Sequence, residues 1–337
     1  MRTSDFDYHL PRELIAQTPV EPRDASRLLV LQRDGGAIEH AHFAEIGRFL
    51  RPGDLLVVNE TRVLRARLRG HVTESGGAVE ALLLRRVDAQ RWEAMVRPGR
   101  RLRPGRRVWF GSLEAVVEDV VEDGHRILRF AADVDPENTG ETPLPPYIHT
   151  ALAEPERYQT VYGTVTGSAA APTAGLHFTP ALLERLQADR IGLARVLLHV
   201  GPGTFKPVAE EDPRLHPMHA EWYEITTNAC TAIEETRARG GRVVAVGTTS
   251  VRVLEQAGRD AGDGPLQPGS GFTRLLILPG HRFRVVDALV TNFHLPRSTL
   301  LMLVSALAGQ EPVLSAYREA VKHGYRFYSF GDAMLIV

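Results

Sequence analysis

The feature that most constrains the fold is a regular alternation of short apolar runs and capped helical segments from residue 179 onward. Thr179-Pro180 opens a helix, because threonine is a good N-cap and proline is favoured at the first helical position. Further strands are predicted at 191–200, 242–246, 275–278 and 285–290, and further helices at 228–239, 249–257, 298–308 and 313–322. This alternation predicts a sheet with helices packed on it.

A different pattern occupies residues 66–130, where short apolar or alternating runs are separated by glycine-containing turns. It predicts short strands at 66–72, 79–84, 92–96, 108–110, 113–121 and 127–130, which is typical of a small antiparallel barrel or sandwich. The proline-rich segment 142–147 reads as a stiff connector. We therefore predict an α/β fold: a discontinuous α/β catalytic domain (1–63 and 143–337) with an inserted small antiparallel β-barrel domain (64–142).

Composition excludes several classes of protein. The single cysteine, Cys230, rules out an intramolecular disulfide and any zinc site that needs two thiolates. Asp5, Asp7 and Glu13 stand where a signal peptide needs an apolar core. The apolar runs are far shorter than the roughly 20 residues that span a bilayer. We expect a cytoplasmic protein with no membrane contact, and a monomer.

The first segment that could carry chemistry runs from an apolar strand into Gly247 and then into Thr248, Thr249 and Ser250. Free N–H groups and hydroxyls at the start of a helix suit a phosphate or a carboxylate. A plain helix N-cap would use the same residues, so both interpretations stay open. The segment lacks the Gly-Lys-Ser/Thr of a Walker loop and the spaced glycines of a dinucleotide fingerprint.

Two more segments place histidines where predicted strands end: His199 precedes Gly201, and His294 follows Asn292. Ligands of open α/β sheets gather beyond strand ends, although structural histidines would give the same pattern. In 216–221, two histidines and Glu221 could suggest a metal site. Pro217 prevents a regular helical His-x-x-His face there, so no metal is predicted.

Together with the small-residue loop 169–178, these segments resemble the S-adenosylmethionine:tRNA ribosyltransferase-isomerase family of queuosine biosynthesis. The resemblance covers nearly the whole chain, and motifs this long in this order are highly specific. The matching motifs lie at 6–11, 26–29, 52–56, 59–62, 143–148, 158–162, 170–178, 198–201, 203–205, 218–219 with 221, 245–252, 291–296, and 325–327 with 331–332. The chain departs from the family pattern at Glu60, Leu64 and Thr166, and it stops soon after Met334.

The resemblance implies a reaction in which the ribosyl carbons of S-adenosylmethionine pass to 7-aminomethyl-7-deazaguanine at the wobble position of tRNA. The products are epoxyqueuosine-tRNA, adenine and methionine. The sulfonium acidifies the adjacent carbon, so the site needs a general base, an acid for the leaving adenine and exclusion of water. S-adenosylmethionine acts as a co-substrate, and no bound cofactor is expected.

The resemblance also implies roles for individual residues. The expected catalytic residues are His177, His199, His294 and Glu221. The expected substrate-binding residues are Thr173, Gly175, Gly201, Thr204, His219, Gly247, Thr248, Thr249, Ser250, Arg252 and Asn292. Glu221 would face the sulfonium or the attacking amine, and Arg252 would help the hydroxyl loop to hold the methionine carboxylate.

The expected partner is a tRNA with a GUN-type anticodon that carries the modified base. The net charge of −1 gives no nucleic-acid signature by itself. Arginines nevertheless crowd 97–107 without an acidic residue, so we predict a tRNA contact there through Arg100, Arg101, Arg106 and Arg107. A solvated, arginine-biased loop is the alternative. Another phosphoribosyl-type transferase and a non-catalytic tRNA-binding protein remain rival functions.

Overall fold

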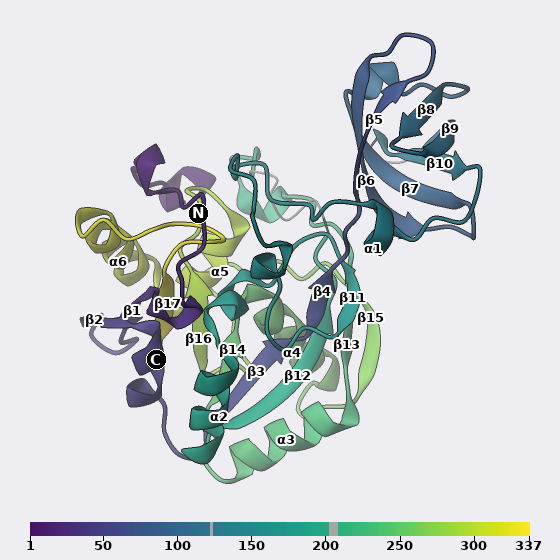
Figure 1. The fold of residues 1–337 in the computed structure, drawn as a ribbon. Coiled ribbons are helices and arrows are strands. Elements are labelled where there is room, and N and C mark those ends of the chain that lie inside the picture. The colour runs from purple at the N-terminus through teal and green to yellow at the C-terminus, as the bar shows by residue number, and fades with distance from the viewer. Residues whose placement is uncertain (122–123, 202–207) are drawn as a thin grey trace. The chain divides into compact units, whose positions relative to one another are not determined.

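The computed structural model describes residues 1–121, 124–201 and 208–337 of the chain. They form two compact units: Met1–Arg62 with Pro145–Val337, and Val63–Leu144. Figure 1 shows the strands of the second unit in blue and the C-terminal helices of the first in yellow-green. The predicted α/β fold with a small antiparallel barrel is confirmed.

In the larger unit, the described residues form one nine-stranded sheet in the order β15-β13-β12-β3-β14-β16-β17-β1-β2. Strands β12, β3, β14 and β16 run parallel to one another, and β17 lies antiparallel to β16. The strands are β1 (Arg27–Leu31), β2 (Ile38–His42), β3 (Leu55–Asn59), β12 (Gly192–Leu198), β13 (Glu221–Ile225), β14 (Val243–Val246), β15 (Gly269–Thr273), β16 (Ala288–Asn292) and β17 (Ala333–Ile336).

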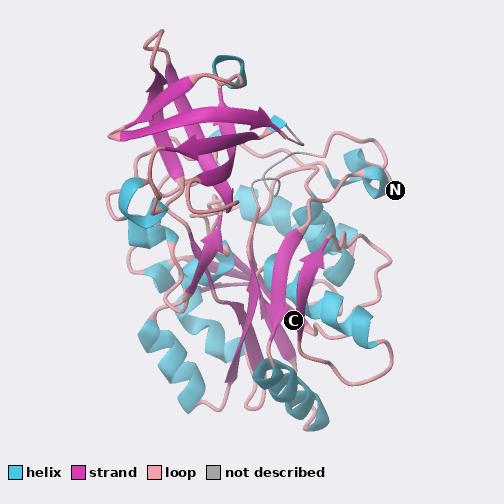
Figure 2. Ribbon diagram, turned by 90° about the vertical axis from the view of Figure 1, so that its right-hand side faces the viewer, coloured by secondary structure: helices cyan, strands magenta, loops and turns pink. Residues whose placement is uncertain are grey.

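Helices cover both faces of this sheet (Figure 2). They are α2 (Pro180–Ala188), α3 (Thr227–Ala238), α4 (Thr248–Ala261), α5 (Thr299–Ala308) and α6 (Gln310–Lys322). Side chains alternate along a strand, so Val57 of β3 joins the core that contains α3 to α6, whereas Val58 joins the core that contains α2. Thr179 caps α2 as predicted, because its hydroxyl accepts a hydrogen bond from the Leu182 N–H.

The predicted strand at 275–278 is wrong: its backbone is irregular, and Ile277 is buried in the core beside α4. An apolar run that fills a core looks the same in sequence as a strand. The strand predicted at 285–290 starts later, at Ala288. Sequence reasoning also missed β1, β2, β13, β15 and β17, which lie outside the central parallel strands.

In the second unit, six described strands close into a barrel in the order β10-β7-β6-β5-β8-β9, with antiparallel pairing between neighbours. They are β5 (Arg67–Val72), β6 (Ala78–Arg86), β7 (Arg91–Arg97), β8 (Arg107–Phe110), β9 (Leu113–Val120) and β10 (Arg126–Phe130). A short helix, α1 (Pro136–Thr139), follows the barrel. Strands β4 (Thr61–Val63) and β11 (Val165–Ser168) form a separate pair.

In the described part of the chain, no single helix is long and apolar enough to cross a membrane. Helices α5 and α6 pass that test only as a pair, by length and composition, and they are bent by 115° where they meet.

Candidate active site

A cavity of about 250 Å³ lies beyond the carboxyl ends of β14 and β16 in the larger unit. This is where open α/β sheets bind their ligands, because the loops that follow the strands diverge there. The walls come from the small-residue loop, the start of α4, the segment after β16, and two aromatic residues. The lining residues include 170–174, Gly247, Thr248, Thr249, 291–296, 298–300, Tyr147, Tyr328 and Ser329.

Asn292, the last residue of β16, holds the centre of a buried polar network. Its Nδ2 donates to the Tyr328 carbonyl over 3.2 Å, which fixes the orientation of the amide. The same nitrogen lies 3.1 Å from Nε2 of His177, and Oδ1 accepts from the Thr173 hydroxyl over 3.0 Å. The amide is thus positioned on one side by a histidine and on the other by a threonine that lines the cavity.

His177 is a neutral imidazole with both ring nitrogens occupied. Because Nε2 accepts from Asn292, Nδ1 carries the proton and donates to the Ser26 hydroxyl over 2.7 Å. Burial, together with the positive charges of Arg23 and Arg326, lowers the pKa of His177 to about 3. His177 therefore contacts Asn292, which lines the cavity.

His294 lines the cavity directly and is only 9% exposed. Its Nε2 lies 2.8 Å from the Thr291 hydroxyl, and its backbone N–H donates to the Tyr317 hydroxyl over 3.0 Å. Burial lowers the pKa of His294 to about 3, so the ring is neutral at physiological pH. It offers the cavity a neutral imidazole held in a fixed orientation.

The start of α4 forms another wall. Gly247 adopts φ of 85°, a left-handed conformation that glycine tolerates best, and it connects β14 to the helix. Asn59 at the end of β3 donates to the Thr249 hydroxyl over 3.1 Å and to the Leu198 carbonyl over 3.0 Å. Asn59 therefore fixes the position of the Thr249 hydroxyl at the N-terminus of α4. The free N–H groups and the helix dipole favour an anion there.

An aromatic pair closes the cavity. The rings of Tyr147 and Tyr328 are stacked, with centroids 4.5 Å apart and planes 25° apart. The Tyr147 hydroxyl is bonded to Ser329 over 2.6 Å, and burial raises its pKa to about 12. Tyr328 adopts φ of 71°, which is uncommon for a residue with a side chain. Such a wall suits a flat heteroaromatic ring.

A smaller pocket contains Glu221, the first residue of β13, and Arg252 of α4. Their side chains form a buried ion pair. The second carboxylate oxygen of Glu221 accepts from the Gly201 N–H over 2.8 Å, and Arg252 also donates to the Leu275 carbonyl over 3.2 Å. This pocket shares Thr299 and Leu300 with the larger cavity. The charges of Glu221 and Arg252 compensate each other within the protein.

Comparison with known proteins identifies the family. The model of the queuosine biosynthesis protein family matches residues 3–336. The chain belongs to this family. It is 58% identical to the S-adenosylmethionine:tRNA ribosyltransferase-isomerase of Symbiobacterium thermophilum and 57% identical to that of Moorella thermoacetica, over the full length of both chains in each case. A similar structure is the crystal structure of an S-adenosylmethionine tRNA ribosyltransferase from Thermotoga maritima, whose sequence is 45% identical. The two structures superpose with a TM-score of 0.59, and the match covers 99% of this chain and 100% of that one.

The resemblance seen in the sequence is therefore confirmed, and the family's motifs can be located in the structure. Five residues predicted to bind substrate line the cavity: Thr173, Gly247, Thr248, Thr249 and Asn292. One predicted catalytic histidine, His294, lines it with them. Glu221, Arg252 and His219 line the smaller pocket. Thr204 lies outside the described residues.

Three other predicted residues are engaged away from the cavity lining. The Ser250 hydroxyl donates to the Val246 carbonyl over 2.8 Å and is fully buried. Nδ1 of His199 lies 2.8 Å from the Thr61 hydroxyl, and burial lowers the pKa of His199. A Cβ on Gly175 would lie 2.0 Å from the Tyr162 hydroxyl, so this glycine permits close packing.

Sequence reasoning missed three residues of the site as functional candidates: Asn59, Tyr147 and Tyr328. The signal for Asn59 was the apolar run 55–58, which reads as a short buried strand and ends just before it. Tyr147 stood at the end of the proline-rich connector, which reads as structural. Nothing local marked Tyr328, since it meets Tyr147 only through the fold.

Proposed function

We propose that this protein transfers and isomerises the ribosyl moiety of S-adenosylmethionine onto 7-aminomethyl-7-deazaguanine at the tRNA wobble position. The products are epoxyqueuosine-tRNA, adenine and methionine. Full-length relatives at 51–58% identity carry the name of this activity. The observation that carries the proposal is the cavity at the strand ends, which combines an aromatic wall, an anion-favouring helix start and a neutral buried histidine.

Each part of S-adenosylmethionine has a complementary wall. The stacked Tyr147 and Tyr328 suit the adenine ring, and the hydroxyls of Thr248 and Thr249 at the start of α4 suit the methionine carboxylate. Asn292 would then hydrogen-bond the ribose between them. The apolar neighbours of these groups exclude water, which protects a reactive sugar from hydrolysis.

We assign the first proton transfer to His294, because it is the candidate histidine that lines the cavity. A neutral imidazole has a lone pair that accepts a proton from the carbon beside the sulfonium. Loss of that proton gives an ylide, the adenine leaves, and the sugar carbons become electrophilic toward the amine of the modified base. Burial makes His294 a weak base, so the acidity of the carbon beside the sulfonium has to drive this transfer.

The other predicted catalytic residues act through neighbours in this proposal. His177 positions Asn292, and His199 positions Thr61. Glu221 accepts from the Gly201 N–H and is itself held by its buried ion pair with Arg252. None of these roles needs a bound cofactor, and S-adenosylmethionine enters as a co-substrate.

The partner of the proposed reaction is a tRNA with a GUN-type anticodon, bound by a monomer in the cytoplasm. We propose that the barrel unit contributes the phosphate contacts. Arg100 and Arg101 belong to a short helical turn after β7, Arg107 is the first residue of β8, and Arg106 directly precedes it. All four side chains are exposed or nearly so. Arginines that neutralise phosphates would account for affinity for tRNA without recognition of its base sequence.

The stoichiometry of small products tests the function. Adenine and methionine should appear in equal amounts, and only with a tRNA that carries the aminomethyl base, when products are separated by chromatography. Methylated tRNA with S-adenosylhomocysteine would show a methyltransferase instead. Binding of tRNA without turnover would favour a non-catalytic tRNA-binding protein, and turnover of a phosphoribosyl donor would favour the other transferase class.

A further inference from the structure

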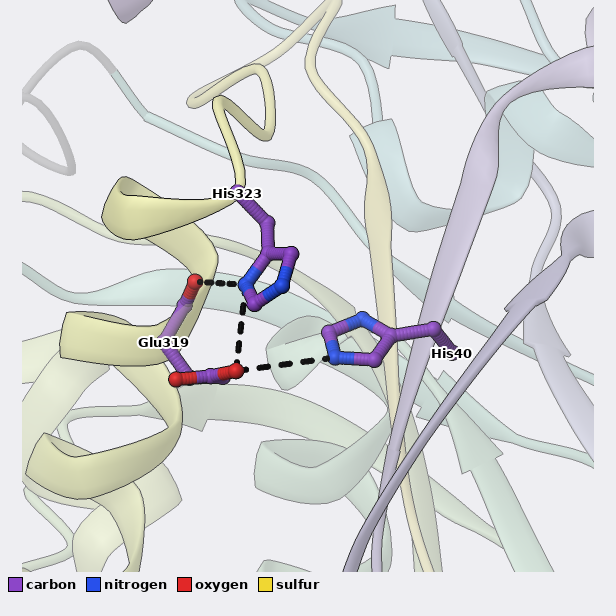
Figure 3. A group of neighbouring side chains, drawn as sticks. All are labelled: His40, Glu319 and His323. Atoms are coloured by element: carbon purple, nitrogen blue, oxygen red, sulfur yellow. Dashed lines mark hydrogen bonds and ion pairs between the residues drawn. The ribbon is translucent and has the colours of Figure 1, made fainter.

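Two histidines and a glutamate meet at the surface of the larger unit, outside the lining of the cavity. His40 comes from β2, an edge strand of the sheet, whereas Glu319 lies in the last turn of α6 and His323 is the C-cap residue of that helix (Figure 3). One ligand atom from each of the three residues lies within 4.8 Å of the others. Because Glu319 and His323 are four residues apart on a helix, their side chains share one face.

The distances between the three ligand atoms are close to the distances between ligand atoms around a small divalent ion. Nε2 of His40 lies 3.9 Å from Oε1 of Glu319, and Nδ1 of His323 lies 3.1 Å from the same oxygen. Donors at about 2.0–2.1 Å from a tetrahedral zinc ion are roughly 3.3 Å apart. Nδ1 of His323 also donates to the backbone carbonyl of Glu319 over 3.1 Å. Small changes of side-chain torsion, with loss of that proton, therefore bring all three donors onto one ion, with the fourth position open to water.

Tyr325 holds the His40 ring by a hydrogen bond, as residues behind a metal-binding histidine commonly do. Its hydroxyl lies 2.7 Å from Nδ1 of His40. In the tautomer that carries its proton on Nδ1, this N–H donates to Tyr325 and Nε2 keeps its lone pair toward Glu319. Tyr325 is 1% exposed and packs edge-on against Phe293, which makes it a rigid anchor. His40 itself remains 40% exposed, so an ion from solvent can reach the group.

The charged side chains near the three residues leave one carboxylate oxygen of Glu319 for a bound cation. Lys322 lies 3.7 Å from Oε2 of Glu319, the oxygen that does not face the histidines. Arg27 stacks over the Tyr325 ring at 4.0 Å, but its charge is compensated by the buried carboxylate of Asp332 at 3.2 Å. Neither cation occupies the space between the three donors.

We propose that His40, Glu319 and His323 form a zinc site that links the edge strand β2 to the end of α6. Two imidazoles and a carboxylate are a donor set that Zn²⁺ favours. Bound zinc adds a cross-link between segments nearly 280 residues apart and so stabilises the folded chain. The site is independent of the proposed ribosyl transfer.

Titration of the tag-free, chelator-treated chain with ZnCl₂, followed by calorimetry, tests this site. We expect one ion per chain, an increase of the melting temperature with zinc concentration, and a tetrahedral cobalt spectrum when CoCl₂ replaces zinc. His40→Gln, Glu319→Gln and His323→Gln should each abolish this binding. Tyr325→Phe keeps all three donors and should weaken zinc binding about 10–100-fold.

His42→Gln is the matched control. His42 lies on the same strand as His40 and 3.9 Å from Glu45, so it offers a histidine–glutamate pair that has no third donor among the described residues. This variant should bind zinc like the parent chain. Absence of stoichiometric binding, binding retained by all three ligand variants, or equal loss in His42→Gln would each overturn the site. An unchanged affinity in Tyr325→Phe would overturn the role of the tyrosine.

Discussion

The cavity of the larger unit and the surface of the barrel unit hold polar and charged side chains in opposite ways. Around the cavity of the larger unit, Asn292, His177 and His294 are buried, bonded within the protein and uncharged. In the barrel unit, arginines stand at the surface and pair with exposed carboxylates, as Arg86 does with Asp133. Buried neutral groups suit chemistry on a small molecule, because a dry site strengthens their hydrogen bonds. Exposed arginines suit a polyanion, whose phosphates can replace weak surface pairs.

The largest expected effect comes from the cavity. His294→Ala should lower the single-turnover rate of ribosyl transfer about 10²–10⁴-fold, which is typical for loss of an acid–base group. Affinity for tRNA should stay near that of the parent chain, since His294 is buried in the cavity wall. His9→Ala, which changes an exposed histidine, is the control. A rate within roughly threefold of the parent would remove His294 from the chemistry.

The second effect concerns stability. Glu221→Gln keeps an oxygen that accepts from the Gly201 N–H but leaves Arg252 buried without its counter-charge. We expect the free energy of unfolding to fall by about 3–5 kcal/mol, measured by denaturant titration.

Glu235→Gln makes the same chemical change in an exposed pair with Arg239 and should change stability by less than about 1 kcal/mol. Equal losses in the two variants would show that the Glu221 pair is not buried in solution. A loss of single-turnover rate in folded Glu221→Gln would place the carboxylate at the reaction instead.

The third effect is a pH dependence of stability. His177 and His294 have pKa values of about 3 in the folded chain, against 6.5 for an ordinary histidine. Below pH 6.5 the unfolded chain therefore binds more protons than the folded chain. The stability that the two neutral histidines contribute to the folded chain is complete above pH 6.5 and declines as the pH falls toward 3. Each histidine should contribute a slope of about 1.4 kcal/mol per pH unit in that window.

Urea titrations between pH 4.5 and 7 can measure this slope. His177→Gln should remove the contribution of one histidine, whereas His71→Gln, at an exposed site of the barrel, should leave the slope unchanged. If His177→Gln has the slope of the parent chain, His177 is not kept neutral by burial.

The smallest effect is expected from the barrel. Replacing Arg100, Arg101, Arg106 and Arg107 by glutamine should weaken tRNA binding and flatten the dependence of log affinity on log salt by up to about 0.7–0.9 per lost contact. Glu74 lies 3.6 Å from Arg106 and Glu114 lies 3.9 Å from Arg107, which moderates the gain from each phosphate contact. Binding of S-adenosylmethionine should not change.

A charge-matched control is available on the same barrel. Arg85, Arg86, Arg91 and Arg129 are also exposed and paired with carboxylates, so their fourfold glutamine variant removes the same net charge. It should leave the salt slope near that of the parent chain. Equal flattening in the two variants would mean that only the net charge of the barrel matters, and an unchanged slope in both would place the tRNA on the larger unit.

The sequence by itself determined the two kinds of architecture and the strand ends that meet at the cavity. Glycine turns between short apolar runs delimited the barrel strands, and apolar runs ending in Gly247 or Asn292 marked the carboxyl ends of β14 and β16. These signals are local, because they depend on side-chain period, capping and backbone freedom. The family motifs lie on the same segments, so the family could also be identified from sequence.

Only the tertiary structure decided which polar residues face open space. Arg252 and Thr249 belong to one helix, yet Arg252 is neutralised by Glu221 from β13 while Thr249 lines the cavity beside Asn59 from β3. The stack of Tyr147 on Tyr328 and the group of His40 with Glu319 and His323 join segments that are far apart in the chain. Such pairings arise when sheet order and helix packing bring distant side chains together, and no period or spacing in the sequence encodes them.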